Sequence, residues 1–259
     1  MDKKTRNLLS TLSVLLLLLL CSLDASGQTP APGSTAAPPQ HLYISKAYWA
    51  ASAAAIALIL VVLGYVIKGN WLGCLVDARN KMSLSRLQIV LWTILVVSAF
   101  FAIGAQAKDM AIYLPPELWA LMAISTGSAA GAVIIKSRKA QQQPAAGIAA
   151  PPGAKTLGVL IEAARPRVSD MFKGEEVIDS DYVDISKVQM FFFTIAALVG
   201  YSIVLGAYDL STPTEGLSAD IAKSYKEYFP AISSALVTLI GISHAGYLTV
   251  KAAPHTPTA

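Results

Sequence analysis

The chain has 259 residues, of which 54% are hydrophobic and only 14% are charged, and its formal net charge is +4. Because a soluble domain usually carries about 25% charged residues, this composition excludes an ordinary water-soluble protein and indicates an all-α membrane protein. The positive charge does not predict nucleic-acid binding, because the basic residues gather at the ends of apolar runs and form no stripe interleaved with aromatic side chains.

The N-terminus has the three-part plan of a secretory signal. Basic residues precede an apolar core that ends at Leu20, and small residues follow at 25–27. We therefore expect residues 1–27 to be a signal peptide that is cleaved. Two alternatives stay open: an uncleaved anchor helix, and a lipoprotein signal that ends at Cys21.

Two stretches rich in proline and alanine are predicted to be irregular. Residues 28–47 and 137–156 bury too little apolar surface to offset the entropy lost on ordering. We expect the first to be a periplasmic tether and the second to link two halves of the protein. Residues 252–259 are expected to form a C-terminal tail.

Five apolar segments are each close to the length of about 20 residues that spans a bilayer. In lipid, every backbone amide must be satisfied within its own segment, so these segments are predicted to be five membrane-spanning helices in the mature chain. The first lies within residues 48–71. The predicted spans are Trp49–Ile67, Leu87–Ala105, Leu118–Ile135, Val188–Tyr208 and Ala231–Val250.

The distribution of basic residues predicts the orientation. If residue 28 is outside, thirteen lysines and arginines of the connecting segments fall inside and four fall outside, the bias that orients helices in the bacterial inner membrane. We expect a periplasmic mature N-terminus and a cytoplasmic C-terminus. The four outer residues are Lys46, Lys108, Lys223 and Lys226.

The sequence contains an internal repeat. Residues 83–94 and 184–195 begin two helices in nearly the same way, and each of these helices is followed by one that opens with a proline. Residues 72–136 and 157–251 are therefore predicted to be two duplicated helix pairs. Both pairs enter from the same side, so we expect parallel repeats related by an axis along the membrane normal.

Three segments carry a resemblance to a family of bacterial multi-span membrane proteins. They are Ser-Leu-Ser-Arg-Leu-Gln…Trp-Thr at 83–93, Ser-Asp-Met-Phe-Lys-Gly-Glu-Glu at 169–176 and Gly-Ile-Ser-His-Ala-Gly-Tyr-Leu at 241–248. The resemblance covers most of the chain after residue 70. It implies the same architecture and the same repeat, and it assigns no catalytic residue.

Polar side chains inside the predicted spans are the candidate functional residues. Ser85 and Gln88 share one helix face, as do Ser186 and Gln189 in the second repeat. The two glutamines either line a polar path or meet across the repeat axis as buried amides that hold helices together, and the structural role is favoured. His244 is the only ionisable residue well inside a span, which makes it a candidate proton or ligand site.

Basic residues at the helix starts and small residues near the helix ends have simpler interpretations. Arg86 and Lys187 occupy equivalent positions, where their cations are expected to reach lipid headgroups. Two small-residue pairs one helical turn apart let helix backbones approach closely, so packing is their expected role. These pairs are Gly127 with Gly131 and Gly241 with Ala245.

Residues 170–184 contain six acids and one lysine. Asp179 to Asp184 lacks the glycine that a calcium-binding loop needs at its sixth position. We expect a solvated connector that offsets nearby bases, and a docking site for a cytoplasmic partner is the alternative.

No nucleophile, phosphate-loop, zinc or paired-cysteine motif is present, so the sequence assigns no catalytic, cofactor-binding or metal-ligating residue. The small-residue helix faces, the tether and the charged inner loop favour a scaffold or assembly subunit. Such a protein would contact the lipid bilayer and either a second copy or other membrane subunits. A small channel or transporter is the alternative, and an intramembrane enzyme that uses His244 ranks third.

Overall fold

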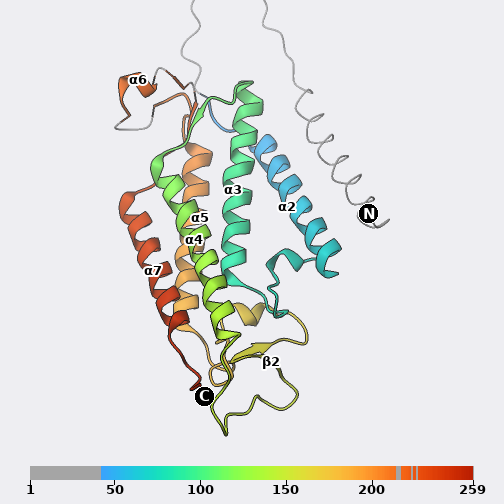
Figure 1. Cartoon of the computed structure of the whole chain (residues 1–259). Coiled ribbons are helices and arrows are strands. Elements are labelled where there is room, and N and C mark those ends of the chain that lie inside the picture. The colour runs from blue at the N-terminus through green and yellow to red at the C-terminus, as the bar shows by residue number, and fades with distance from the viewer. Residues whose placement is uncertain (1–41, 214–216, 223, 226, 259) are drawn as a thin grey trace, which may run out of the picture. The chain divides into compact units, whose positions relative to one another are not determined.

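The computed structural model describes residues 42–213, 217–222, 224–225 and 227–258, and the predicted signal peptide lies outside this part of the chain. The described chain is mostly helical, and five of its helices are long and apolar enough to span a membrane (Figure 1). The prediction of five such helices is therefore confirmed. They are α2 (Lys46–Lys68), α3 (Leu84–Ala107), α4 (Pro116–Lys139), α5 (Ile185–Ala207) and α7 (Ser234–Ala252).

The helices mostly extend beyond the apolar segments seen in the sequence. Helix α4 continues past Ile135 to Lys139, because basic side chains in the last turn favour the negative end of the helix dipole. Helix α7 is the exception, since it begins at Ser234 and not at Ala231. Residues 231–233, which follow Pro230, are not helical.

The chain divides into two compact units, and α3 and α5 each contribute to both. Within the described residues, unit 1 contains the chain up to Trp71 together with Thr93–Pro115 and Tyr201–Ala231. Unit 2 contains Leu72–Trp92, Pro116–Gly200 and the chain from Ile232 onward.

In unit 1, polar side chains join α2 to α3. Trp49 Nε1 donates a hydrogen bond to Ser98 Oγ at 3.0 Å, and Ser52 Oγ donates to the carbonyl oxygen of Ser98 at 2.8 Å. Hydrogen bonds of this kind hold helices together where lipid supplies no hydrophobic driving force.

Unit 1 also contains two short strands that the sequence did not predict. Strand β1 (Ile112–Tyr113) pairs in parallel with β4 (Glu227–Tyr228), and Tyr113 lies opposite Tyr228. The strands precede α4 and α7 respectively, and the short helix α6 (Ala219–Ala222) lies before β4. Strands of two residues carry no readable periodicity, which explains why they were missed.

In unit 2, α4 and α7 pack side by side (Figure 1). At their close approach, a Cβ atom on Gly131 would lie 3.2 Å from Leu248 Cδ1. The apolar core of the unit includes residues of both helices and is formed by Leu75, Val76, Met82, Leu84, Ala132, Met171, Met190 and Tyr247.

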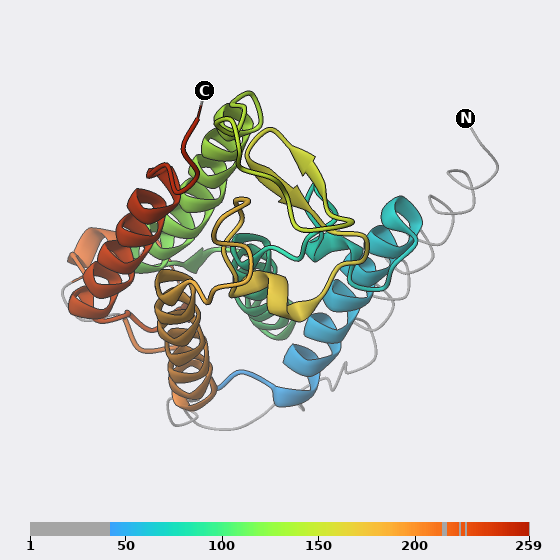
Figure 2. The same ribbon diagram turned by 90° about the horizontal axis from the view of Figure 1, so that it is seen from below.

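A hairpin of β2 (Lys155–Leu157) and β3 (Leu160–Glu162) lies against the C-terminal end of α4 (Figure 2). The turn needs Gly158, because its φ is +60° and a Cβ there would lie 2.5 Å from the carbonyl oxygen of Ala140. Two short 3₁₀ helices, η1 (Gly73–Leu75) and η2 (Val168–Met171), complete the unit. Residues 72–78 and 157–163, which resemble each other in sequence, therefore differ in local structure.

Candidate functional site

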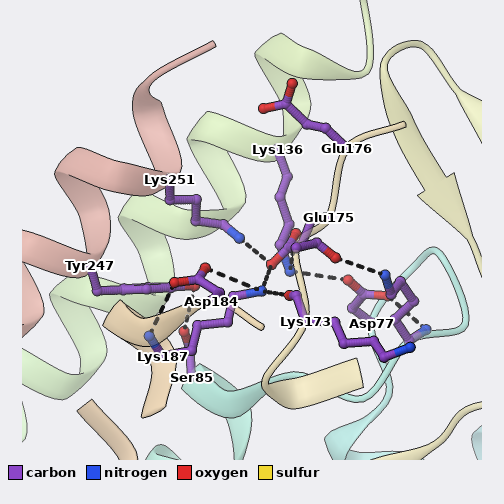
Figure 3. A network of polar contacts seen from close by, with 12 residues as sticks. Asp77, Ser85, Lys136, Lys173, Glu175, Glu176, Asp184, Lys187, Tyr247 and Lys251 are labelled. Carbon is purple, nitrogen blue, oxygen red and sulfur yellow. Dashed lines mark hydrogen bonds and ion pairs between the residues drawn. The ribbon is translucent and has the colours of Figure 1, made fainter. Parts of the chain in front are cut away.

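The hairpin positions a segment that carries two adjacent glutamates. The backbone N–H of Ile161 donates to the carbonyl oxygen of Glu175 at 2.9 Å, and Leu160 forms a β-bridge with Glu176. Successive side chains of an extended segment point to opposite sides. The carboxylates of Glu175 and Glu176 consequently enter two different clusters (Figure 3).

Four cations surround the Glu175 carboxylate (Figure 3). Arg79 Nη2 lies 2.5 Å and Lys136 Nζ 3.7 Å from Oε2. Lys187 Nζ lies 3.0 Å from Oε1, which also pairs with Lys251. Because the four cations come from the turn before α3 and from α4, α5 and α7, one carboxylate ties four separate segments of unit 2.

Asp77 is the second acid of this cluster. Its Oδ2 lies 3.0 Å from both Arg79 Nη2 and Lys136 Nζ. Its Oδ1 accepts the backbone N–H groups of Arg79 at 2.9 Å and Lys81 at 3.1 Å, so the same carboxylate also shapes the turn. We call Asp77, Arg79, Lys136, Glu175, Lys187 and Lys251 the Glu175 network.

The surrounding charges keep both acids ionised. Burial by itself would raise the pKa of Glu175, but Lys251, Lys187, Lys136 and Arg79 outweigh it and hold that pKa well below its usual range. Burial also opposes ionisation of Asp77, and the charges of Arg79 and Lys136 again lower its pKa. A buried charge cluster of this kind is stable only while it remains paired.

Lys187 reaches the network because α5 begins with a capped turn. Asp184 Oδ1 accepts the N–H groups of Ser186 at 3.0 Å and Lys187 at 3.3 Å. The Lys187 ammonium also donates to the carbonyl oxygen of Lys173 at 2.6 Å. The expectation that Lys187 reaches lipid headgroups is wrong, because its partners draw it into the interior and leave it only 3% exposed, whereas Arg86 is exposed.

Glu176 fixes the end of the chain to α4. Its Oε1 lies 2.5 Å from Lys139 Nζ, and its Oε2 accepts the N–H of Thr256 at 2.6 Å. His255 Nδ1 lies 2.5 Å from Asp179 Oδ2. Burial opposes the ionisation of Glu176, but the hydrogen bonds from Lys139 and Thr256 lower its pKa. Residues 252–258, expected to be a tail, are thus held by specific contacts.

Among the predicted polar residues, Gln88 and His244 come together inside unit 2. Gln88 Nε2 donates to Thr194 Oγ1 at 2.5 Å and lies 3.4 Å from His244 Nε2. We call Gln88, Thr194 and His244 the buried polar cluster. Gln189 is exposed while Gln88 is only 1% exposed, so the structure does not bring the two glutamines together as predicted. Gln88 and Gln189 occupy equivalent positions near the starts of α3 and α5, but these two positions have different surroundings. A repeat in the sequence does not show this difference.

The two predicted serines have separate partners. Ser85 Oγ donates to Tyr247 OH at 3.4 Å, one turn from the Gln88 position. Ser186 Oγ donates to Asp184 Oδ1 at 2.5 Å and therefore belongs to the cap of α5.

Several buried polar atoms near this interior have no hydrogen-bond partner within the described residues. Gln88 Oε1 and His244 Nδ1 are two of them, and the others that lie on α4 and α7 are the hydroxyls of Ser125, Ser128 and Ser243. Buried polar atoms usually find a partner, so these atoms mark the polar part of the interior of unit 2.

The four small residues predicted for helix packing differ in their surroundings. Gly131 lies against Leu248, and a Cβ on Gly241 would lie 3.6 Å from Ile124 Cδ1. Gly127 has nothing within 4 Å of its Cβ position, and Ala245 is exposed. Among these four residues, Gly131 is therefore the one at a close helix approach, whereas a Cβ at Gly241 would make an ordinary contact.

The sequence did not single out Glu175, which appeared there as one of six acids in a solvated connector. The signal that could have found it is the set of lysines at the ends of apolar helices, Lys136, Lys187 and Lys251. Cations placed so close to apolar spans need a shared counter-charge.

No protein-family model, curated protein or solved structure matches the chain.

Proposed function

We propose that the protein is a scaffold or assembly subunit of a bacterial inner-membrane complex, and that a partner docks on an exposed surface of residues 178–183. The observation that carries this proposal is the exposure of Ile178, Tyr182 and Val183, which are 48%, 72% and 61% exposed. Apolar side chains grouped on a surface outside the spans are typical of interaction sites.

The loop that presents this surface is closed at its base. The N–H of Gly174 donates to the carbonyl oxygen of Tyr182 at 3.1 Å, and the N–H of Asp184 donates to the carbonyl oxygen of Phe172 at 2.8 Å. The neighbouring Glu175 belongs to the buried network. A partner would therefore meet a preformed loop, and little ordering entropy would oppose binding.

A shallow cleft adjoins the surface and suits an anchoring side chain. It has a volume of about 310 Å³, and its lining includes Tyr182, Val183 and Ile185 together with Val250 of α7. The acids Asp179 and Asp184 also line it, so a partner with an apolar anchor beside a basic side chain fits it best.

Site-specific photo-crosslinking in native membranes tests this function. A photoreactive residue in place of Tyr182 is expected to give one discrete protein adduct. A matched probe in place of Val168, which is 59% exposed on η2, is expected to give none. Val183→Asp should abolish the adduct at position 182.

Lipid adducts alone at position 182, or equal adducts at 182 and 168, would contradict the docking function. A discrete adduct of twice the chain mass would identify the partner as a second copy of this chain.

We also propose the orientation that the basic residues predict. The connecting segments with thirteen basic residues, including the docking surface and the C-terminus, would lie in the cytoplasm. The mature N-terminus would be periplasmic after cleavage of the signal.

We further propose that the two helix pairs are parallel repeats. Strand β1 pairs with β4 so that Tyr113 lies opposite Tyr228, and these residues precede the two prolines that the repeat makes equivalent. Within unit 2, Lys136 and Lys251 each come five residues after a Ser-x-Ala-Gly segment, at 128–131 and 243–246, and both pair with Glu175. Equivalent residues that share a partner are what a duplicated pair about a common axis would give.

A small channel or transporter is the second candidate function. The buried polar cluster and its unpartnered oxygen and nitrogen atoms favour it, because polar interiors of this kind occur along intramembrane paths. Proteoliposomes with an internal pH dye test it. A proton flux that disappears in His244→Leu but persists in Tyr182→Ala would favour transport over the scaffold function.

A further inference from the structure

A lateral groove runs along α4 on the outside of unit 2. It has a volume of about 550 Å³ and is bounded by α4, the first turns of α3 and the hairpin. Ala130 and Val133 of α4 line it and are exposed, and Ile89 of α3 faces them. Exposed apolar side chains on a helix long enough to span a membrane contact lipid, so this groove opens to the bilayer.

The groove ends at basic side chains. Arg86 lines it, is exposed and has no carboxylate partner within the described part of the chain. Arg79 and Lys136 line the same end, where Asp77 pairs with both. Because Glu175 also pairs with Arg79 and Lys136, the charge without a carboxylate partner among the described residues at this end is that of Arg86, and it suits an anion.

The dimensions of the groove match one leaflet. Its α4 wall extends from Thr126 to Ser137, and eleven residues of helix rise about 16 Å. The hydrocarbon core of a bilayer is about 30 Å thick, so this length is about half of it. An acyl chain that follows α4 would bring its phosphate to the level of Arg86.

We propose that the groove binds one anionic phospholipid, with an acyl chain along α4 and the phosphate on Arg86. The guanidinium of arginine binds phosphate oxygens in a bidentate manner, and the hydroxyls of Ser83 and Ser137 line the same end. Lys187 begins α5 as Arg86 begins α3, but it is already paired with Glu175. The groove therefore differs from the docking surface, and it does not depend on the scaffold function.

Lipid titration of the delipidated full chain in non-ionic detergent, followed by native mass spectrometry, tests the site. Phosphatidylglycerol is expected to bind with one copy per chain and about tenfold more tightly than phosphatidylcholine. Glycerol phosphate, which has the headgroup charge without acyl chains, is expected not to compete.

Two variants separate the two halves of the site. Arg86→Gln should weaken the binding of phosphatidylglycerol about tenfold and remove the preference over phosphatidylcholine. Ala130→Leu should fill the groove and weaken the binding of both lipids. Arg138→Gln and Ala123→Leu are the matched controls, because both residues are exposed on α4 and neither lines the groove.

Equal binding of the two lipids by the unchanged chain would overturn the proposal. Competition by glycerol phosphate would show an anion site without an acyl chain. An equal loss of lipid binding in the variants and in their controls would show that the groove is not the lipid site.

Discussion

Removal of the Glu175 carboxylate would leave four buried or half-buried cations without the acid that they share. Among the described residues, their mutual repulsion is then offset by Asp77, which contacts Arg79 and Lys136, and by Asp184, which lies 3.9 Å from Lys187. Breaking a buried pair by removing one partner is much more costly than deleting a surface pair, because the remaining charge stays desolvated.

We therefore expect Glu175→Gln to lower the free energy of unfolding by about 3–5 kcal/mol. The control is Asp181→Asn, because Asp181 is 84% exposed and lies 3.9 Å from Lys173. Loss of this surface ion pair should lower the free energy of unfolding by about 0–1 kcal/mol. Thermal unfolding in non-ionic detergent measures both. A Glu175 variant as stable as the Asp181 control would show that the network does not hold these segments together.

The same carboxylates predict a dependence of stability on pH. The folded-state pKa values of Glu175, Glu176 and Asp77 lie below their ordinary values, so their stabilisation is present above about pH 4.3 and is lost as the pH falls toward the folded-state values. The unfolding temperature should be nearly constant from about pH 8 to 5 and fall below about pH 4.3. In Glu175→Gln the plateau should be lower and the acid decline smaller. An acid decline identical to that of the unchanged chain would assign the effect to other groups.

At the scale of elements, the sequence predicted what depends on local pattern and missed what depends on distant contacts. The five spans followed from runs of apolar residues. The pairs of Glu175 with Arg79 and Lys251 join residues 96 and 76 positions apart. Nothing in a single sequence says which of six acids meets which base.

The buried polar cluster shows the same limit inside one pair of helices. The repeat in the sequence suggests Gln189 as the partner of Gln88. In the structure, Gln88 contacts Thr194 of α5 and His244 of α7, and Thr194 lies five residues after Gln189. Helical rotation places one face of α5 in the interior, and Gln189 lies on the other.

A double-mutant cycle separates these two pairings. Gln88→Leu and Thr194→Val should be coupled by about 0.6 kcal/mol, the average for hydrogen bonds between membrane helices. Gln88→Leu and Gln189→Leu should be additive within about 0.3–0.5 kcal/mol, because the second residue is exposed. Thermal unfolding in detergent supplies the four stabilities of each cycle. Coupling between the two glutamines without coupling to Thr194 would restore the pairing that the repeat suggests.

At the scale of the whole molecule, the proposed orientation rests on the basic residues of the connecting segments. Four of them are not free surface charges, since Arg79, Lys136, Lys187 and Lys251 are bound in the Glu175 network. In the proposed orientation, these residues would orient the chain during insertion, before they are paired, and after folding they hold the segment next to the proposed docking surface. One set of cations would thereby serve both topology and tertiary structure.

Cys74 tests that orientation, because it lies in the short segment between α2 and α3 and is the free cysteine of the described chain. In a Cys21→Ser background, it should resist a membrane-impermeant thiol reagent in intact cells and react after permeabilisation. The reaction should be slow at neutral pH, because burial raises the pKa of the thiol and only the thiolate attacks. It should accelerate as the pH rises, which distinguishes a protected cytoplasmic thiol from one already modified.

A serine-to-cysteine change at exposed Ser211, between α5 and α7, supplies the opposite control and should label in intact cells. Labelling of Cys74 before permeabilisation, or of Ser211→Cys only afterwards, would reverse the orientation and place the docking surface in the periplasm.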